Sequence, residues 1–259
     1  MTVGGQLREW RQRRRMSQLD LALAADVSAR HVSLVETGKS RPSADMVLRL
    51  ADRLDVPLRD RNRLLLAAGH APKFHERPLE GRDLEAAREA VSAVLRAHEP
   101  YPAVVIDGRW NIVMMNRPIE LFLAGVDPAL LEPPVNLVRL GLHPDGLASR
   151  IVNLGQVRAV LRGRLGRQLA QTRDPEIAAL YDEFLAPGPG DEGRPVPIGS
   201  EITTPMIIRF GDEELQLFST VTTFGTPQDI TLEGIAIEAY YPLDARTAEL
   251  LRRPELAAG

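Results

Sequence analysis

Residues 28–41, SARHVSLVETGKSR, combine basic, hydroxyl and apolar side chains in one short stretch. Ser28 is predicted to cap a helix, and Gly38 is predicted to end it, because glycine accepts the left-handed conformation common after a helix. Val32 and Val35 lie three residues apart, so both are expected to face a core. The remaining side chains are then free to contact another molecule.

A second helix is predicted just before this stretch. The sequence SQLD at Ser17 is typical of a capping box, and the helix is expected to end near Ala25. Asp26-Val27 leaves room only for a tight turn. Two short helices joined so closely indicate a helix-turn-helix, in which the start of the second helix reaches base edges in the major groove of DNA.

The outer side chains have the chemistry needed to bind DNA. Arg30 can donate two hydrogen bonds to guanine, with a phosphate contact as the alternative, and Leu34 can contact a thymine methyl group. A solvated or capping role is the alternative for His31, and Glu36 is interpreted as structural. Helix N-termini and basic side chains are expected to hold phosphates. The predicted DNA-binding residues are Gln18, Ser28, Ala29, Arg30, His31, Ser33, Leu34, Lys39 and Arg41.

Charge is distributed unevenly along the 259 residues, which carry a formal net charge of −3. Residues 1–77 contain 15 basic and 9 acidic residues, so this part carries +6 and the rest −9. A small basic region joined to a larger acidic one predicts that only the first binds a polyanion. Basic side chains elsewhere are interpreted mainly as solvated helix faces, although Arg13–Arg15 can include a phosphate contact. The solvated set on the middle helix is Arg158, Arg162, Arg164 and Arg167.

Other function classes have little support. The chain has no cysteine, which excludes disulfides, cysteine-ligated zinc and thiol catalysis. His70 and His75 flank a proline-containing loop that is poor metal geometry. Residues 163–168, GRLGRQ, lack the Lys-Ser/Thr ending of a phosphate-binding loop, and no G-x-S-x-G motif occurs. We therefore expect no catalytic residues, no metal, no cofactor and, without a long apolar run, no membrane span.

The predicted helices and strands divide the chain into two regions. Residues 6–70 are predicted to form five short helices, with Leu19, Leu21 and Leu23 buried on the second. The rest is read as strand, strand, helices over 117–186, and then three strands, TPMIIRF, ELQLFSTVTTF and EGIAIEAYY. Asp107-Gly108 is typical of a two-residue hairpin turn, Gly211-Asp212 is a second turn, and residues 186–200 are a Gly/Pro-rich loop. This order predicts an α+β arrangement with an antiparallel five-stranded sheet after an all-α, five-helix domain.

The motifs resemble known families. Residues 7–57, including SQLDLA, ETGKSRPS and LADRLDVP, resemble the Cro/repressor-type (XRE) helix-turn-helix domain. NRLLLAAGHAP, AHEPYPAVVIDGRWNIVMMN, PPVNLVRLGLHPDG, RIVN and FGTPQDITLEGIAIEAYYPLD resemble MmyB-like regulators, which fuse such a domain to a PAS-like ligand-binding domain. The resemblance covers nearly the whole chain. It implies a transcription regulator that senses a small apolar ligand, with a fatty acid as the suggestion from the family. LEGIAIE departs from the family pattern at Gly234, and a glycine there weakens the start of the last strand.

On this basis we predict a helix-turn-helix domain at 1–72, a linker and connecting helix at 73–98, and a PAS-like domain at 99–259. A fatty acid needs an apolar tunnel and a cationic or hydrogen-bonding partner for its carboxylate. Arg139 is the candidate partner, with a salt bridge inside the domain as the alternative; the alternative for the apolar candidates is an ordinary core. The predicted ligand-binding residues are Trp110, Met114, Asn116, Phe122, Asn136, Leu137, Arg139 and Phe218.

We expect a cytoplasmic homodimer that binds a two-fold related operator in double-stranded DNA, with its recognition helices about 34 Å apart. Ligand binding would shift the dimer geometry and change DNA affinity by linkage. One alternative is a ligand-free regulator that a protein partner controls through the second domain. A third hypothesis is an enzyme with a DNA-targeting domain.

Overall fold

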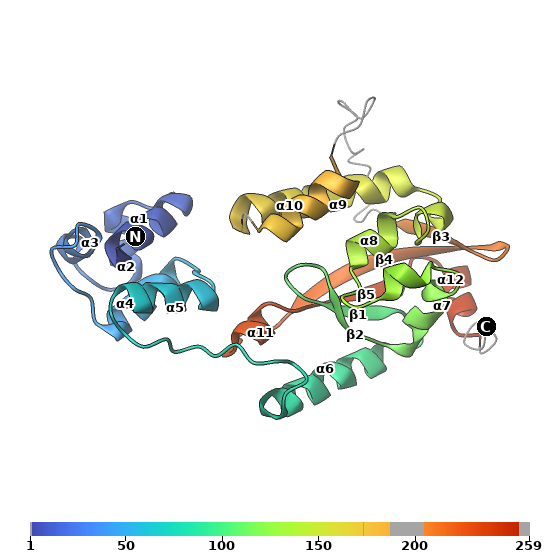
Figure 1. Cartoon of the computed structure of the whole chain (residues 1–259), viewed down its shortest axis with the longest axis horizontal. Helices are drawn as coiled ribbons and strands as arrows, with labels where there is room; N and C mark the ends of the chain where they lie inside the picture. The colour runs from blue at the N-terminus through green and yellow to red at the C-terminus, as the bar shows by residue number, and fades with distance from the viewer. Residues whose placement is uncertain (1, 173, 187–204, 254–259) are drawn as a thin grey trace. The chain divides into compact units, whose positions relative to one another are not determined.

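The computed structural model describes residues 2–172, 174–186 and 205–253 (Figure 1). The chain divides into two compact units: unit 1 contains everything up to Glu85 together with Phe224–Gly234, and unit 2 contains the remainder. Most of the predicted loop at 186–200 lies outside the described residues. In the part of the chain that the structure describes, no helix is long and apolar enough to cross a membrane.

Unit 1 contains the five predicted helices. Their N-termini follow the sequence signals, because the side chains of Ser17, Ser28 and Ser43 each accept a hydrogen bond from a backbone N–H three residues later. Ser17 and Asp20 form the full capping box. The helices are α1 (Val3–Arg13), α2 (Gln18–Ala24), α3 (Ala29–Glu36), α4 (Ala44–Arg53) and α5 (Leu58–Ala67).

One core joins these five helices. Leu7, Leu21, Val32, Leu50 and Leu64 are all buried in it. The prediction that Leu19 and Leu23 are buried with Leu21 is wrong, since they are 57% and 73% exposed. Residues spaced by two on a helix point in very different directions, and only Leu21 faces the core.

The sheet of unit 2 has five strands in the order β2-β1-β5-β4-β3, and every neighbouring pair is antiparallel. This confirms the predicted α+β arrangement. Gly211-Asp212 forms the turn between β3 and β4, and Gly211 has a positive φ of 58°. The strands are β1 (Ala103–Ile106), β2 (Ile112–Met115), β3 (Met206–Phe210), β4 (Glu213–Thr223) and β5 (Ala236–Pro242).

The first hairpin differs from the prediction. Asp107-Gly108 does not form a two-residue turn, because the connection from β1 to β2 spans residues 107–111. The Asp107 carboxylate accepts hydrogen bonds from the backbone N–H groups of Arg109 and Asn111, and Trp110 adopts a positive φ of 69°. The longer loop carries the Trp110 side chain into the interior, where it is buried.

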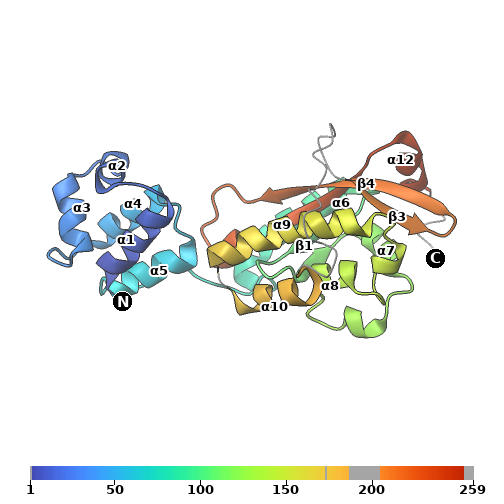
Figure 2. The ribbon, with the colours of Figure 1, turned by 90° about the horizontal axis from the view of Figure 1, so that it is seen from above.

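Helices cover both faces of the sheet. Figures 1 and 2 show α6 (Glu85–His98) on one side and α8 to α10 on the other. Leu165, Ile177 and Leu180 pack with Val104 and Ile106 of β1, so the sheet has its main core on the second side. The helices after β2 are α7 (Glu120–Leu123), α8 (Leu137–Leu142), α9 (Leu154–Thr172) and α10 (Pro175–Phe184), and α12 (Ala245–Leu251) follows β5.

The connection between β4 and β5 contains a helix that the sequence did not predict. The strand expected from Glu233 begins only at Ala236, and Ile230–Glu233 form the short helix α11. Asp229 caps α11, and Gly234 ends it. Gly234, where the sequence departs from the family pattern, is therefore the end of a helix rather than part of a strand.

Candidate functional site

The first candidate surface lies on α3 in unit 1. The turn from α2 to α3 passes through Asp26, which has a positive φ of 53°, and Ser28 then caps α3 through the N–H of His31. Val32 and Val35 are buried, as predicted. Arg30 is exposed on the other side of the helix, so the geometry of α2 and α3 is that of a helix-turn-helix.

The other predicted DNA-binding residues fall into two groups. Ser28 and Lys39 are exposed with Arg30, whereas Ala29, His31, Ser33 and Leu34 are partly buried. Among the described residues, the structure records no side-chain partner for Arg30 or Lys39. Gln18 and Arg41 are engaged within the unit: the Gln18 amide donates to Glu36, and the Arg41 guanidinium donates to the carbonyls of Ala68 and Gly69.

A buried ion pair fixes α3 against α1. Arg11 donates from Nε to Glu36 Oε1 at 2.6 Å and from Nη2 to Oε2 at 2.9 Å, and its Nη1 donates to the carbonyl of Met16. Burial raises the pKa of Glu36, but hydrogen bonds from Arg11 and Gln18 and the charges of Arg11 and Arg8 outweigh it, so the pKa is lowered. Glu36 is thus a structural residue, as expected.

Close backbone packing between α1 and α3 also holds α3 in place. A Cβ added to Gly4 would lie 2.2 Å from the carbonyl oxygen of Val35. Only glycine allows the two backbones to approach so closely. The helix α3 is therefore held on its buried side by an ion pair and by direct backbone packing.

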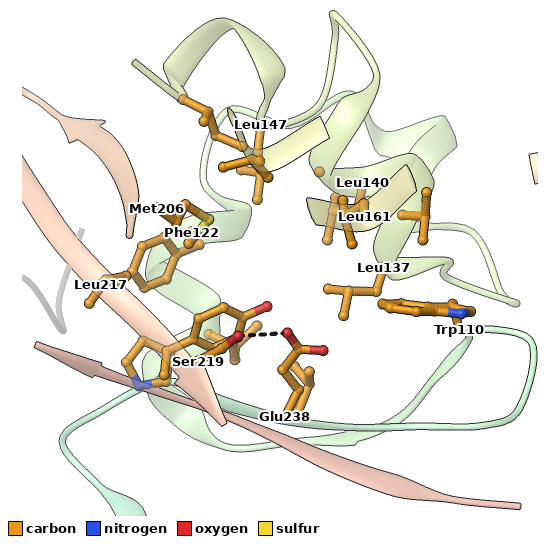
Figure 3. Close-up of a pocket in the computed structure, with 18 of the residues that line it drawn as sticks. Trp110, Phe122, Leu137, Leu140, Leu147, Leu161, Met206, Leu217, Ser219 and Glu238 are labelled. Atoms are coloured by element: carbon orange, nitrogen blue, oxygen red, sulfur yellow. Dashed lines mark hydrogen bonds between the residues drawn. The ribbon is translucent and has the colours of Figure 1, made fainter. Parts of the chain in front are cut away.

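The second candidate site is an apolar pocket inside unit 2, with a cavity of about 140 Å³. It lies between the sheet and the helices that cover its main core, and Figure 3 shows side chains converging on it from strands and helices. An apolar cavity of about 150 Å³ is large enough to bind a small apolar molecule. Apolar side chains that line it include Trp110, Phe122, Leu137, Leu140, Leu147, Leu161, Met206 and Leu217.

Polar groups gather in one part of this pocket. Glu238 on β5 accepts hydrogen bonds from Arg164 on α9, at 3.1 and 3.3 Å. It also accepts one from Ser219 on β4 at 3.0 Å, which Figure 3 marks with a dashed line. The Arg164 guanidinium lies over the Trp110 ring, 4.5 Å from its centroid. The Glu238 carboxylate is therefore hydrogen-bonded to the Arg164 guanidinium and to the Ser219 hydroxyl, and all three residues line the cavity.

Tyr240 is also among the residues that line the pocket. Burial and the nearby charge of Glu238 raise its pKa well above the usual value, although Arg164 opposes this. The phenol therefore stays protonated at neutral pH. Since the structure records no hydrogen-bond partner for this hydroxyl among the described residues, it can donate to an acceptor on a bound molecule.

The predicted ligand-binding residues are only partly brought together. Trp110, Phe122 and Leu137 line the pocket. The lining does not include Met114, Asn116, Asn136, Arg139 or Phe218.

Each of the polar residues outside the lining has a different contact. Asn116 bonds the backbone of Ala103 and Tyr101, and Asn136 caps α8. Arg139 is exposed and pairs with Glu183 at 2.8 Å, which is the alternative anticipated for it.

Sequence reasoning missed the polar part of the pocket. Arg164 was interpreted as part of a solvated helix face, which is wrong because its partner, Glu238, is buried in the sheet. The available signal was the alternation in β5, where Ala236, Glu238 and Tyr240 point to one face. A carboxylate in line with apolar positions indicates a buried partner of opposite charge.

The two candidate sites differ in what they can do. The described residues contain no group of three or more histidine or acidic side chains that could hold a metal ion. The α3 surface has exposed hydrogen-bond donors that a large partner can reach, whereas the pocket has room for a small apolar molecule beside hydrogen-bonding groups.

Comparison with known proteins finds family matches over both units. Residues 7–60 match a helix-turn-helix family, and residues 87–253 match the MmyB-like transcription regulator ligand binding domain. No curated protein matches the chain. A solved structure described as an RNA-binding Light-Oxygen-Voltage Receptor shares 12% identity with a TM-score of 0.28 over 93% of this chain and 62% of that one. This low similarity carries no argument about function.

Proposed function

Because the chain belongs to the MmyB-like transcription regulators and combines a helix-turn-helix with their ligand-binding domain, we propose that a small apolar ligand in the pocket controls sequence-specific DNA binding by α3. The observation that carries this proposal is the 140 Å³ apolar cavity with Arg164, Glu238, Ser219 and Tyr240 in its lining. A filled core would leave no space for a ligand, and such a cavity is the expected form of a small-molecule site.

A fatty acid or a related acyl compound fits this chemistry. The Tyr240 hydroxyl can donate to a carboxyl or ester oxygen, and Arg164 keeps further N–H donors beyond the two used by Glu238. Arg164 takes the role that the sequence suggested for Arg139. Because Glu238 already balances the charge of Arg164, neutral acyl compounds are expected to bind nearly as well as ionised acids.

The cavity also limits ligand size. A cavity of about 150 Å³ holds a molecule of about six carbons, so a longer chain requires side chains at the mouth of the pocket to move. Val160, which lines the pocket and is exposed, is positioned to do so. Each added CH₂ is expected to contribute about 0.8 kcal/mol while it remains buried and little once it reaches solvent.

A direct ligand test uses straight-chain acids and their methyl esters of increasing length. Binding is followed by Trp110 fluorescence in the W10F variant, because Trp10 and Trp110 are the two tryptophans of the chain. Saturable binding that strengthens and then levels with chain length supports the proposal. If no member of either series binds, control by a protein partner through unit 2 becomes the better account.

On the DNA side, we propose a homodimer that reads a two-fold related operator, with Arg30 at a base and Lys39 at a phosphate. Selection of bound sequences from random duplexes should return a two-fold motif. Arg30→Ala should cost about 1 to 3 kcal/mol at that motif and relax its base preference, whereas Lys39→Ala should weaken binding to all sequences and lower the salt slope by about one. Uniform weakening by Arg30→Ala would reassign Arg30 to phosphate.

A further inference from the structure

The connection between β4 and β5 leaves the sheet and belongs to unit 1. β4 ends at Thr223 and β5 begins at Ala236, and these two residues form the last pair of their ladder. The segment Phe224–Gly234 between them clusters with α1 to α5 rather than with the sheet. We call this segment the α11 strap.

The strap is held in unit 1 by several hydrogen bonds. The backbone N–H of Ile230 donates to the carbonyl of His75 at 2.8 Å, and Thr231 Oγ1 donates to the carbonyl of Arg77 at 2.6 Å. Ile230 is buried, and Asp229 caps α11 from a buried position. These contacts attach the strap to the chain that follows α5.

Glu233 makes the contact with the most direct effect on a helix. Its two carboxylate oxygens lie 3.1 and 2.8 Å from the backbone N–H of Leu58, the first residue of α5. The residue at the N-cap position, Pro57, has no side chain able to accept this hydrogen bond. Glu233 therefore supplies the cap and a negative charge at the positive end of the helix dipole.

Both ends of the strap lead to the pocket. Leu217 and Ser219 on β4 line the cavity, as do Glu238 and Tyr240 on β5. Glu238 follows Glu233 by five residues. A molecule that fills the cavity contacts these two strands, and the strap is the chain that joins them.

The start of α5 connects to the recognition helix by packing within unit 1. α5 contacts α1, and α1 contacts α3 through the Gly4 approach and the pair of Arg11 with Glu36. We propose that the α11 strap transmits pocket occupancy to the DNA-binding unit, with Glu233 as the residue that positions α5. The proposal rests on the proposed function for the ligand and adds the route by which it acts.

The test measures amide hydrogen exchange at the start of α5 in the full chain, so it requires neither DNA nor a known ligand. Val157→Phe fills the cavity from α9. If that variant fails to fold, Val160→Phe fills the cavity from an exposed position on the same helix. Either change should alter protection of the first turn of α5 by about fivefold, a size typical of coupling between sites. Glu233→Ala should lower that protection about fivefold and abolish the response to the cavity-filling variant.

Two controls keep the interpretation specific. Glu132→Ala removes an exposed carboxylate from unit 2, and the response to Val157→Phe should persist in it. Glu233→Gln, which keeps one acceptor oxygen, should restore part of the protection. The proposal is overturned if filling the cavity leaves α5 unchanged, or if the response survives Glu233→Ala.

A ligand arm separates this proposal from the proposed function. Octanoic acid is added as the probe, and its binding is followed by Trp110 fluorescence in the W10F background. If octanoic acid binds Glu233→Ala but leaves amide exchange at the start of α5 unchanged, the result supports transmission through the α11 strap. Failure of octanoic acid to bind the parent chain counts against the acyl ligand only, since the cavity-filling variants still decide the coupling.

Discussion

Each unit contains an arginine–glutamate pair with a buried carboxylate, and the two pairs differ in their surroundings. In unit 1, Arg11 and Glu36 are sealed in the core, with side chains 11% and 2% exposed and further hydrogen bonds to Met16 and Gln18. In unit 2, Arg164 is 26% exposed and Glu238 is 6% exposed, and both line an open cavity. The same two residue types therefore fix a helix in one unit and offer hydrogen-bonding groups in the other.

The difference lies in geometry more than in composition. The unit 1 pair has bonds of 2.6 and 2.9 Å, whereas those of the unit 2 pair are 3.1 and 3.3 Å. Charge-assisted hydrogen bonds are stronger when short and well aligned. A pair that faces a cavity can exchange partners with a bound molecule, and a sealed pair cannot do so without unfolding.

The largest effect is expected from breaking the sealed pair. Arg11→Ala leaves the Glu36 carboxylate buried without its main partner, so unit 1 should lose about 3 to 5 kcal/mol of stability. Urea unfolding of the W110F variant, in which Trp10 reports on unit 1, measures the loss. Arg63→Ala, which removes an exposed arginine paired with Asp60 in the same unit, is the matched control and should change stability by less than about 1 kcal/mol.

Breaking the open pair should cost less. In Arg164→Ala, Glu238 keeps its hydrogen bond from Ser219 and can be solvated from the cavity, so we expect a loss of about 1 to 3 kcal/mol in unit 2. Trp110 fluorescence in the W10F background follows this unfolding. A loss as large as that of Arg11→Ala would show that Ser219 and solvent in the cavity do not compensate Glu238 for the loss of Arg164. It would contradict the expected difference between the two pairs.

A smaller effect is expected when the hydroxyl of Tyr240, a residue of the unit 2 pocket, is removed. Tyr240→Phe removes one hydroxyl without removing the ring, so the stability of unit 2 should change little. Affinity for octanoic acid should fall about fivefold to tenfold, as expected when one hydrogen bond is lost. Equal affinity in both proteins would mean that the acyl head group lies elsewhere in the pocket.

The smallest effect is expected in the pH dependence of unit 1 stability. The pKa of Glu36 is lowered in the folded state, so its contribution to stability is present above its ordinary value of 4.5 and is lost as pH falls through the folded-state pKa. Asp20, whose pKa is lowered by hydrogen bonds from Ser17, adds an effect of the same sign. The pH dependence of unit 1 stability should therefore be weaker in Glu36→Gln than in the parent chain, and an unchanged acid limb would contradict the assignment.

Features set by neighbours along the chain could be predicted from the sequence. The caps at Ser17, Ser28 and Ser43 and the turn at Gly211-Asp212 depend on residues only a few positions apart. Apart from α11 and α12, the order of helices and strands followed from the same local patterns. The sequence also indicated that Glu36 is structural, because it ends the helix that carries two buried valines.

Features set by distant residues could not be predicted. Arg164 meets Glu238 across 74 positions, and Leu58 meets Glu233 across 175. On its helix, Arg164 differs little from Arg167, which is exposed. The same limit applies to Leu19 and Leu23, since residue type alone does not tell which face of a short helix meets the other helices.

The course of the α11 strap bears on how such a protein can evolve by exchange of domains. The chain enters unit 1 twice, first as residues up to Glu85 and again as Phe224–Gly234. A recombination event at a single point near residue 85 would join α5 to a foreign sheet and remove its cap at Leu58. After an exchange of the second unit, α5 therefore keeps its cap only if the new β4–β5 connection carries an acceptor in the place of Glu233.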